Sequence, residues 1–254
     1  MATEILEIFN AENGIVSCVG AGGKKTTMFR LAMAHTEAHS GRVGITATAH
    51  IEYFPKSLKA TNYIADESEL FDAIRNDKNS KAIAFAKPSE RFGRRAGVSP
   101  NSIQKFKDIG KFDLLVIKAD GARGRFIKAP AEHEPAIVSC SNTVIPILSS
   151  KVIGLPLTDE IAHRVEQISK VTGLKEGEII EPIHIARLLS SSEGSLKNTG
   201  AAKVIPLINM VDDGELGKLA REAAELALQM TDQFDSVVLA AMKKDEPIVD
   251  VIKR

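Results

Sequence analysis

Short apolar segments alternate with amphipathic segments along the chain, and this alternation constrains the fold more than any other feature. Residues 112–119 (FDLLVIKA) are almost continuously hydrophobic, which is typical of a parallel strand covered on both faces. Residues 24–38 instead place apolar side chains at helical spacing. Strands and helices in alternation predict βαβ units built around a mostly parallel sheet.

The same reading assigns most of the remaining chain. Strands are expected at residues 14–20, 42–48, 81–86, 112–119, 142–148, 203–209 and 236–241. Helices are expected at residues 24–38, 67–75, 100–108, 159–172, 182–190 and 215–231. Ligands of parallel sheets bind beyond the carboxyl ends of the strands, so the residues that follow each strand are the candidates for function.

Composition excludes several classes of protein. Lysine plus arginine and aspartate plus glutamate both number 33, and aromatic residues make up only 5%, so we expect no nucleic-acid partner. No apolar run approaches the ~18 residues that span a bilayer, and the acidic N-terminus lacks a signal pattern. We therefore expect a cytoplasmic protein without a membrane partner, in which Cys18 and Cys140 are free thiols.

A glycine-rich loop follows the first strand and leads directly into a helix. Glycines allow a tight turn in which backbone N–H groups converge on an anion, and a lysine at the helix start reaches the terminal phosphates. A hydroxyl after that lysine commonly holds magnesium. The candidate phosphate-binding residues are Gly20, Ala21, Gly22, Gly23, Lys24, Lys25, Thr26 and Thr27.

The loop aligns with the common G-x-x-x-x-G-K-[ST] pattern in two ways. If Gly23 and Lys24 are the glycine–lysine pair, Cys18 holds the first glycine position and Lys25 the hydroxyl position. If Lys25 and Thr26 are the lysine–hydroxyl pair, Val19 and Lys24 hold the glycine positions. The spacing by itself leaves both alignments open.

Two further strand ends carry candidate residues. Asp120 follows the central strand, where a carboxylate commonly holds magnesium directly or through water, although an Asp-Gly turn is the alternative. Asn209 and Asp212 follow a later strand with the spacing of the N-K-x-D element that reads guanine. Met210 stands in the lysine position of that element, and helix capping by Asp212 or Asp213 is an equal alternative.

Polar residues also gather in two other places. Residues 46–50 (TATAH) follow the second strand and suit contacts to phosphate or to metal-bound water, with a structural turn as the alternative. Residues 120–135 form the densest polar stretch of the chain. Its Glu132-His133-Glu134 run could suggest a metal, but three consecutive residues cannot all face one point.

Several of these motifs together resemble one family, the selenium-dependent molybdenum hydroxylase accessory proteins. They are V-G-A-G-G-K at residues 19–24, T-A-T-A-H-I at 46–51, the stretch ADGARGRFIKAPAEHEP at 119–135, and the pair His163-Arg164. The resemblance runs over nearly the whole chain and is most specific in K-A-P-A-E-H-E-P. It implies a P-loop-type nucleotide-binding fold and a role in the maturation of molybdenum hydroxylases.

The resemblance also assigns roles to individual residues. Lys24 matches the P-loop lysine, Asp120 the aspartate after the central strand, and Asn209 and Asp212 the base-recognition element. This chain departs from the family pattern at Lys25, Lys118 and Met210, where the family has a hydroxyl residue, a glutamate and a lysine. These departures bear on hydrolysis more than on binding.

We therefore expect a three-layer α/β fold with a mostly parallel sheet and flanking helices, similar to P-loop NTPases. Residues 1–254 are expected to form one domain with a helical elaboration at about 155–200. Lys24 and Asp120 are the predicted catalytic residues, and Thr26 and Asp120 the predicted metal ligands. The nucleotide is expected to be GTP or ATP with Mg²⁺, and the partner a molybdenum hydroxylase or its cofactor.

Three hypotheses for function follow, of which the third, a small-molecule kinase on the same fold, requires an acceptor pocket with a catalytic carboxylate that the sequence does not indicate. In the first, the protein is a nucleotide-binding accessory factor that acts as a magnesium-dependent nucleoside triphosphatase. In the second, it is a chaperone or scaffold that does not hydrolyse nucleotide, and the basic stretch 123–128 holds an anionic pterin cofactor or a partner enzyme. The sequence indicates neither the nucleotide nor the oligomeric state.

Overall fold

The structure is a computed structural model that describes residues 2–254. The chain forms two compact units, each assembled from separate stretches of sequence. The first unit contains residues 2–18, 27–120 and 136–143, and the second contains residues 19–26, 121–135 and 144–254.

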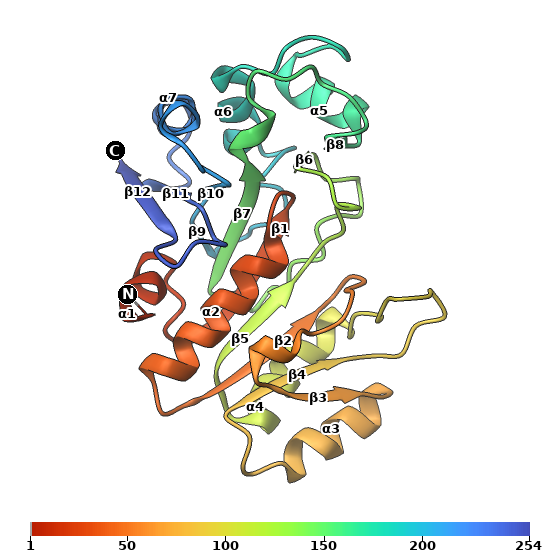
Figure 1. Cartoon of the computed structure of the whole chain (residues 1–254). Helices are drawn as coiled ribbons and strands as arrows, with labels where there is room; N and C mark the ends of the chain where they lie inside the picture. Colours follow the sequence, from red (N-terminus) through yellow and green to blue (C-terminus); the bar gives the residue numbers. More distant parts are fainter. Residues whose placement is uncertain (1) are drawn as a thin grey trace. The chain divides into compact units, whose positions relative to one another are not determined.

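The first unit is built on parallel strands (Figure 1). Its sheet has the order β1-β5-β2-β4-β3, and Cys18 on β1 lies opposite Lys118 on β5. The strands of the centre, β5 and β4, are buried almost along their whole length, as the apolar sequence predicts. The strands are β1 (Gly14–Gly20), β2 (Arg42–Ala47), β3 (Thr61–Ile64), β4 (Ala82–Ala86) and β5 (Phe112–Lys118).

Helices cover both faces of this sheet. In Figure 1, α2 lies in front of it and α4 lies behind it. The core beneath α4 contains the rings of Phe85, Phe106 and Phe112, and the Phe85 and Phe106 centroids are 4.7 Å apart. The helices are α1 (Ala2–Ile8), α2 (Lys24–Ala38), α3 (Glu67–Asn76) and α4 (Ile103–Gly110), with short 3-10 turns η1 (Lys56–Leu58) and η2 (Pro100–Ser102).

In the second unit, β7, β10 and β11 are parallel and β12 is antiparallel to β11. The short strand β9 also pairs with β7. The break between β9 and β10 contains Pro206, which has no N–H to donate to a neighbouring strand. The strands are β7 (Thr143–Ser149), β9 (Lys203–Val204), β10 (Leu207–Asn209), β11 (Ser236–Ala240) and β12 (Ile248–Lys253).

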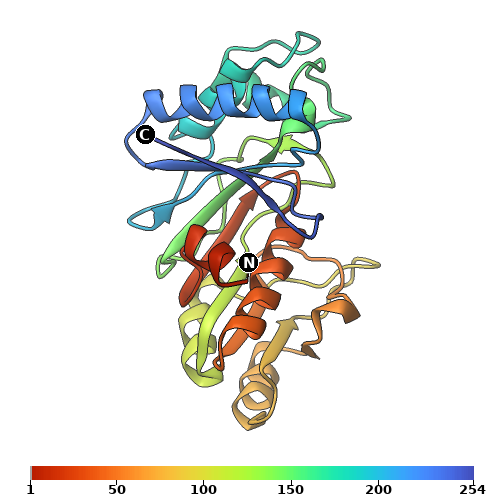
Figure 2. The same ribbon diagram turned by 60° about the vertical axis from the view of Figure 1, so that its left-hand side comes forward.

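Three helices complete the second unit. Figure 2 shows α7 from the side, and α7 packs against β11, β12 and α6. A two-stranded sheet pairs Ile127 with Ala162 and Lys128 with His163. The elements are α5 (Val165–Thr172), α6 (Pro182–Ser190), α7 (Gly214–Met230), β6 (Ile127–Lys128), β8 (Ala162–His163) and the 3-10 turn η3 (Ser150–Val152).

The predicted fold class, a mostly parallel sheet with flanking helices, is confirmed. The helix expected at 159–172 begins only at Val165, because residues 162–163 pair as a strand and the Ile161 carbonyl accepts from Phe126. The expected helical elaboration contains α5 and α6, whereas the single domain stays a prediction. Across residues 2–254, no helix is long and apolar enough to cross a membrane.

Candidate functional site

The glycine-rich loop has a backbone that only glycine tolerates. Gly20, Gly22 and Gly23 have φ values of +90°, +79° and +137°. A Cβ atom on Gly20 would lie 2.2 Å from the Ile147 carbonyl oxygen, and one on Gly22 would lie 2.7 Å from the Phe126 carbonyl oxygen. Glycine is therefore required here both for the left-handed backbone and for the close approach of neighbouring main chain.

Hydrogen bonds within the second unit hold this loop in place. The Ala21 N–H donates to the Ile147 carbonyl at 2.8 Å, and the Gly22 N–H donates to the Arg125 carbonyl at 3.2 Å. The carbonyl of Gly22 in turn accepts a hydrogen bond from the Asn209 side-chain amide at 2.8 Å. The loop is thus fixed before any ligand binds, which lowers the entropic cost of binding.

The loop passes directly into α2, which begins at Lys24 and has no acidic residue in its first turn. The first N–H groups of a helix have no intrahelical partner, and they carry a partial positive charge that favours anions. Lys24 is buried, and its ammonium donates to the Gly20 carbonyl within the loop itself. Lys25 and Thr26 are half-buried, whereas Thr27 is fully buried.

Asn209 uses both ends of its amide within the protein. Its Nδ2 group donates to the Gly22 carbonyl, and its Oδ1 atom accepts from the Met242 N–H at 3.0 Å. The side chain is 2% exposed. Asn209 therefore connects the glycine-rich loop to the turn that follows β11, a role that the spacing of the sequence did not indicate.

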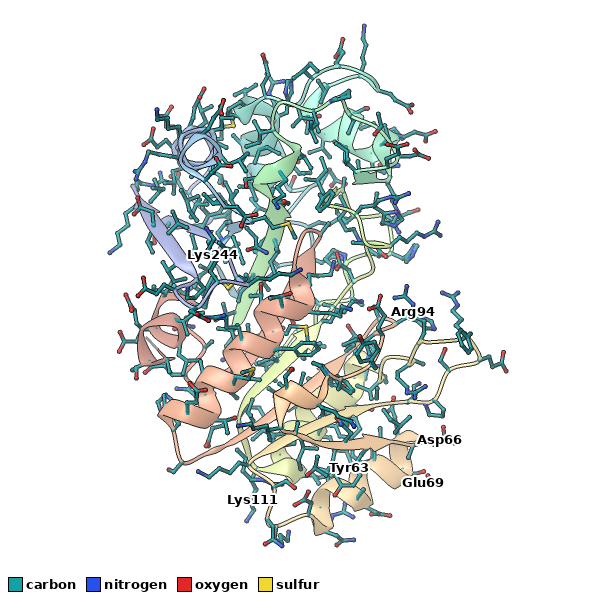
Figure 3. All side chains as sticks on the ribbon, viewed as in Figure 1. Tyr63, Asp66, Glu69, Arg94, Lys111 and Lys244 are labelled. Carbon is teal, nitrogen blue, oxygen red and sulfur yellow. The ribbon has the colours of Figure 1, made fainter. Side chains whose placement is uncertain are left out.

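Asp212 lies among lysines. Its carboxylate pairs with the Lys151 ammonium at 2.6 Å, and its main-chain carbonyl accepts from Lys244, which is labelled in Figure 3. The residue that caps α7 is Asp213, whose side chain accepts from the N–H groups of Glu215 and Leu216. Lys151 lies just after the end of β7, so it is one of the residues after strands that are candidates for function in a parallel sheet.

Asp120 and Lys118 lie at the end of β5, in the first unit. Asp120 is 2% exposed and Lys118 is 7% exposed. The Lys118 ammonium donates to the main-chain carbonyls of His50, at 2.6 Å, and Asp120, at 2.5 Å. Lys118 thus ties the segment after β2 to the end of β5. Asp120 and Thr26 belong to different units, so their joint magnesium site stays a prediction.

The hydroxyl residues after β2 have structural partners. The Thr46 hydroxyl donates to the Phe85 carbonyl at 2.7 Å, and the Thr48 hydroxyl donates to the Ala136 carbonyl at 2.8 Å. Burial and the charges of Arg91, Lys118 and Arg94 lower the pKa of His50. These contacts favour the structural turn over the phosphate-contacting alternative for residues 46–50.

A partly buried ionic network occupies the stretch that is densest in polar residues. Glu134 Oε2 accepts from the Lys128 ammonium at 2.5 Å and from the Arg164 guanidinium at 2.6 Å. Lys128 also donates to the Gly121 carbonyl, and its side chain is only 1% exposed. The sequence placed these residues in one stretch but did not predict that they pair with Arg164, which lies far along the chain.

This network shifts two pKa values. Burial alone would raise the pKa of Glu134, but the hydrogen bonds and charges of Arg164 and Lys128 outweigh it and lower the pKa to about 2. Burial, followed by the charges of Arg164, Lys128 and Arg123, lowers the pKa of His163 to about 4. The imidazole of His163 is therefore neutral at physiological pH, next to an excess of positive charge.

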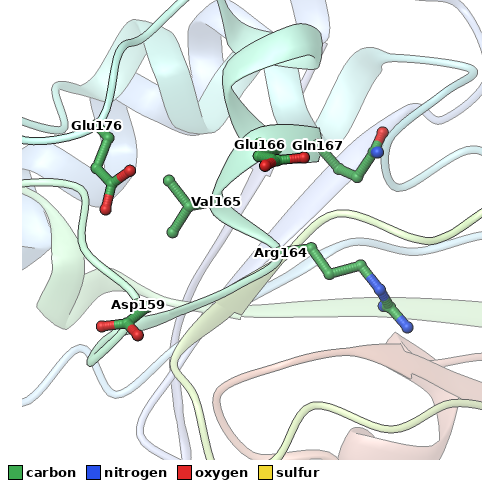
Figure 4. Close-up of a pocket in the computed structure, with 6 residues that line it drawn as sticks. All are labelled: Asp159, Arg164, Val165, Glu166, Gln167 and Glu176. Atoms are coloured by element: carbon green, nitrogen blue, oxygen red, sulfur yellow. The ribbon is translucent and has the colours of Figure 1, made fainter.

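A shallow pocket of about 420 Å³ lies beside the start of α5 (Figure 4). In Figure 4 the Arg164 side chain points away from Asp159 and Glu176, toward the ionic network rather than across the pocket. Within residues 2–254, no group of three or more histidine, cysteine, aspartate or glutamate side chains is arranged to hold a metal. Of the Glu132-His133-Glu134 run, Glu134 is the charge partner of Lys128 and Arg164.

The strand, the glycine-rich loop and the helix that begins at Lys24 define an α/β protein with a mostly parallel sheet. A family model described as the YqeC protein matches residues 16–166. The protein named "Uncharacterized protein YqeC" from Escherichia coli (strain K12) is 32% identical over 184 residues, which cover 72% of this chain and 70% of that protein. The chain belongs to the YqeC family.

Two solved structures show a weaker likeness. The hydrogenase maturation factor HypB from Archaeoglobus fulgidus has a TM-score of 0.41 and 12% identity, covering 96% of this chain and 88% of that one. HypB from Helicobacter pylori, solved in complex with nickel, has a TM-score of 0.40 and 14% identity, with coverages of 96% and 86%. TM-scores of this size do not establish a shared fold or a shared function.

Proposed function

We propose that this protein binds a magnesium–nucleoside triphosphate at the loop of residues 20–26 and serves as an accessory factor in the maturation of molybdenum-cofactor hydroxylases. The observation that carries the proposal is the pre-formed loop. Three glycines with left-handed backbone lead into a helix start, and Lys24 is folded onto the loop carbonyl of Gly20. A glycine-rich turn that leads into a helix start with a lysine is typical of an anion site.

In this proposal, Lys24, the glycines and Thr26 of the loop have different roles in ligand binding. Lys24 exchanges its contact with the Gly20 carbonyl for a phosphate oxygen, which is a stronger acceptor because it is charged. The glycines let the phosphate chain approach the main chain closely. Thr26 is the more accessible of the two threonines, so we assign its hydroxyl to Mg²⁺. Hydroxyl and carboxylate oxygens are the hard ligands that Mg²⁺ prefers.

The accessory role is supported by the motifs of residues 119–135. In this chain that stretch is braced by the network of Lys128, Glu134 and Arg164, so its main chain is positioned firmly. Its Arg125 carbonyl accepts from the loop residue Gly22. We therefore propose that the same segment that contacts the nucleotide loop also carries the family's specific function toward a molybdenum hydroxylase or its anionic pterin cofactor.

A second candidate function is nucleotide binding without turnover, and Lys118 favours it. The family that this sequence resembles has a glutamate at the position of Lys118. Here the Lys118 ammonium donates to two main-chain carbonyls instead. A carboxylate that could order an attacking water is thereby absent from that position. Lys25 likewise stands where a magnesium-binding hydroxyl is expected.

One experiment separates these candidates. The full chain is titrated calorimetrically with ATP, GTP, CTP and molybdopterin in the presence of Mg²⁺, and phosphate release is measured in parallel. Binding with turnover supports the triphosphatase, and binding without turnover supports the scaffold. If none of the nucleotides binds, the proposed nucleotide site is wrong.

A further inference from the structure

The turn of residues 122–125 lies directly against the glycine-rich loop in the second unit. The Arg125 carbonyl accepts from the Gly22 N–H at 3.2 Å, and the next carbonyl, of Phe126, accepts from the Ser149 N–H at 3.1 Å. A Cβ atom on Gly22 would meet Phe126 O and Ser149 N, each at 2.7 Å. The segment that carries Arg123 and Arg125 is thus in main-chain contact with the loop.

This turn has an unusual backbone for arginine. The Arg125 N–H donates to the Ala122 carbonyl at 2.9 Å, and the two central residues, Arg123 and Gly124, have φ values of +49° and +79°. Left-handed backbone at both central residues is typical of turns that use asparagine or glycine at the first of them. Arginine at that position costs conformational energy relative to glycine.

Both guanidinium groups are available to a ligand. Arg123 is exposed and Arg125 is half-buried. Across residues 2–254, neither side chain forms an ion pair or a hydrogen bond, in contrast to Arg164, which is paired with Glu134. The turn therefore offers two arginines whose donors are not used by the protein itself.

The surroundings of the turn carry an excess of positive charge. Arg164 and Lys128 share the single carboxylate of Glu134. The pKa of His163 is lowered by burial and then by the charges of Arg164, Lys128 and Arg123. The charge of Arg123 therefore also acts on this cluster. The local potential thus favours an anion, and the nearest proposed anion site is the glycine-rich loop that the turn contacts.

We infer that Arg123 and Arg125 contact the phosphate chain of the nucleotide seated on the loop, and that they complete the anion site begun by Lys24. The inference rests on the proposed nucleotide binding and adds to it two residues and a chemical specificity. Guanidinium groups bind phosphate oxygens through pairs of hydrogen bonds, so they favour a long phosphate chain over any particular base.

The test uses two variants of the full chain that keep the fold. Arg123→Gly removes the guanidinium and places at φ +49° the residue that best tolerates it, so its thermal stability should equal or exceed that of the wild type. Arg125→Ala leaves the main-chain contact with Gly22 in place. Arg254→Ala is the matched control, because this arginine pairs with exposed Asp232 in the C-terminal segment.

Calorimetric titrations with ATP, GTP and inorganic tripolyphosphate, each with Mg²⁺, give the readout. Arg123→Gly and Arg125→Ala should each weaken binding of all three ligands about tenfold, as expected for loss of a charge-assisted hydrogen bond. The Arg254→Ala protein should bind like the wild type.

Three outcomes overturn the inference. If both arginine variants bind all three ligands with wild-type affinity, the arginines are not in the site, and the proposed function still stands. If affinity for the nucleotides falls but affinity for tripolyphosphate does not, the arginines do not act on the phosphate chain. If the wild-type protein binds none of the three ligands, the proposed function and the inference are both wrong.

Discussion

The Asn209 side chain donates to the Gly22 carbonyl at 2.8 Å, although the two residues are 187 positions apart in the sequence. Its other amide atom accepts from the Met242 N–H. One buried side chain therefore couples the glycine-rich loop to the main chain after β11. The base-reading role expected for Asn209 stays a prediction, and the geometry adds a second role, which is to position the loop.

The first prediction concerns this coupling. Asn209→Ala should lower the free energy of unfolding by about 1–3 kcal/mol, because a buried carbonyl and a buried N–H lose their partner. Denaturant unfolding measures this loss. Asn209→Asp keeps the acceptor for Met242 but removes the donor to Gly22, so it should weaken ATP and GTP binding to a similar degree. A loss confined to GTP would assign Asn209 to the base instead.

The second prediction decides between the two alignments of the loop. Lys24→Ala should weaken triphosphate binding by about tenfold or more, since it removes an ammonium that is held inside the loop. Lys25→Ala should have a smaller effect, because Lys25 occupies the hydroxyl position of the favoured alignment. Calorimetric titration of both variants is the measurement, and a larger loss for Lys25→Ala would shift the alignment by one residue.

The third prediction concerns Lys118. Lys118→Met should lower the free energy of unfolding by about 1–3 kcal/mol, because the carbonyls of His50 and Asp120 lose a charged donor. Lys118→Glu should destabilise the protein further, since a carboxylate would face two carbonyl oxygens. The structure thus argues against a gain of hydrolysis on introducing the family's glutamate here.

Lys81→Met is the control for Lys118. Lys81 is exposed, so its replacement should leave the denaturation midpoint within experimental error of the wild type. Equal stabilities for Lys118→Met and Lys81→Met would show that the two carbonyl contacts of Lys118 do not contribute to folding.

The fourth prediction is a pH dependence that originates at Glu134. Its pKa is about 2 in the folded protein against an ordinary value of 4.5, so the stability it contributes is fully present above pH 4.5 and is lost as the pH falls toward 2. Glu134→Gln removes this dependence. At neutral pH it should also cost about 3–5 kcal/mol, because it leaves the buried Lys128 without its charge partner.

Thermal unfolding of wild type and Glu134→Gln between pH 7 and pH 2 tests this. The two stability curves should converge as the pH falls below 4.5. The exposed neighbour Glu132 supplies the matched control, and Glu132→Gln should follow the wild-type curve. A constant difference between wild type and Glu134→Gln over the whole range would contradict the assignment.

The fifth prediction concerns the base. If Asp212 reads guanine, Asp212→Asn should reduce the preference for GTP over ATP by about 1–3 kcal/mol, because an amide offers one acceptor and one mismatched donor. Lys151→Ala frees the Asp212 carboxylate from its ion pair and should leave the preference intact or increase it. The ratio of GTP to ATP dissociation constants is the readout, and a wild-type ratio near one would end the guanine hypothesis.

Local sequence determined most of the regular structure. The strand and helix around the glycine loop, β1 and α2, have the predicted bounds, because an apolar β-branched run and a helical spacing each stabilise one local conformation. The glycines of the loop are likewise readable from the sequence, since no other residue tolerates their backbone. The edge strand β12 is not expected from the sequence, because IVDVIK does not alternate between apolar and polar residues.

Only the tertiary structure decided what the polar residues do. Asn209 reaches Gly22, and Glu134 pairs with Arg164, across separations that no local pattern encodes. The helix expected at 159–172 lost its first part because pairing of residues 162–163 with β6 outweighed local helix propensity. Local propensities depend on only a few neighbouring residues. A buried donor or charge instead pairs with the partner that the folded chain brings within about 3 Å, and the packing of the whole unit determines which partner that is.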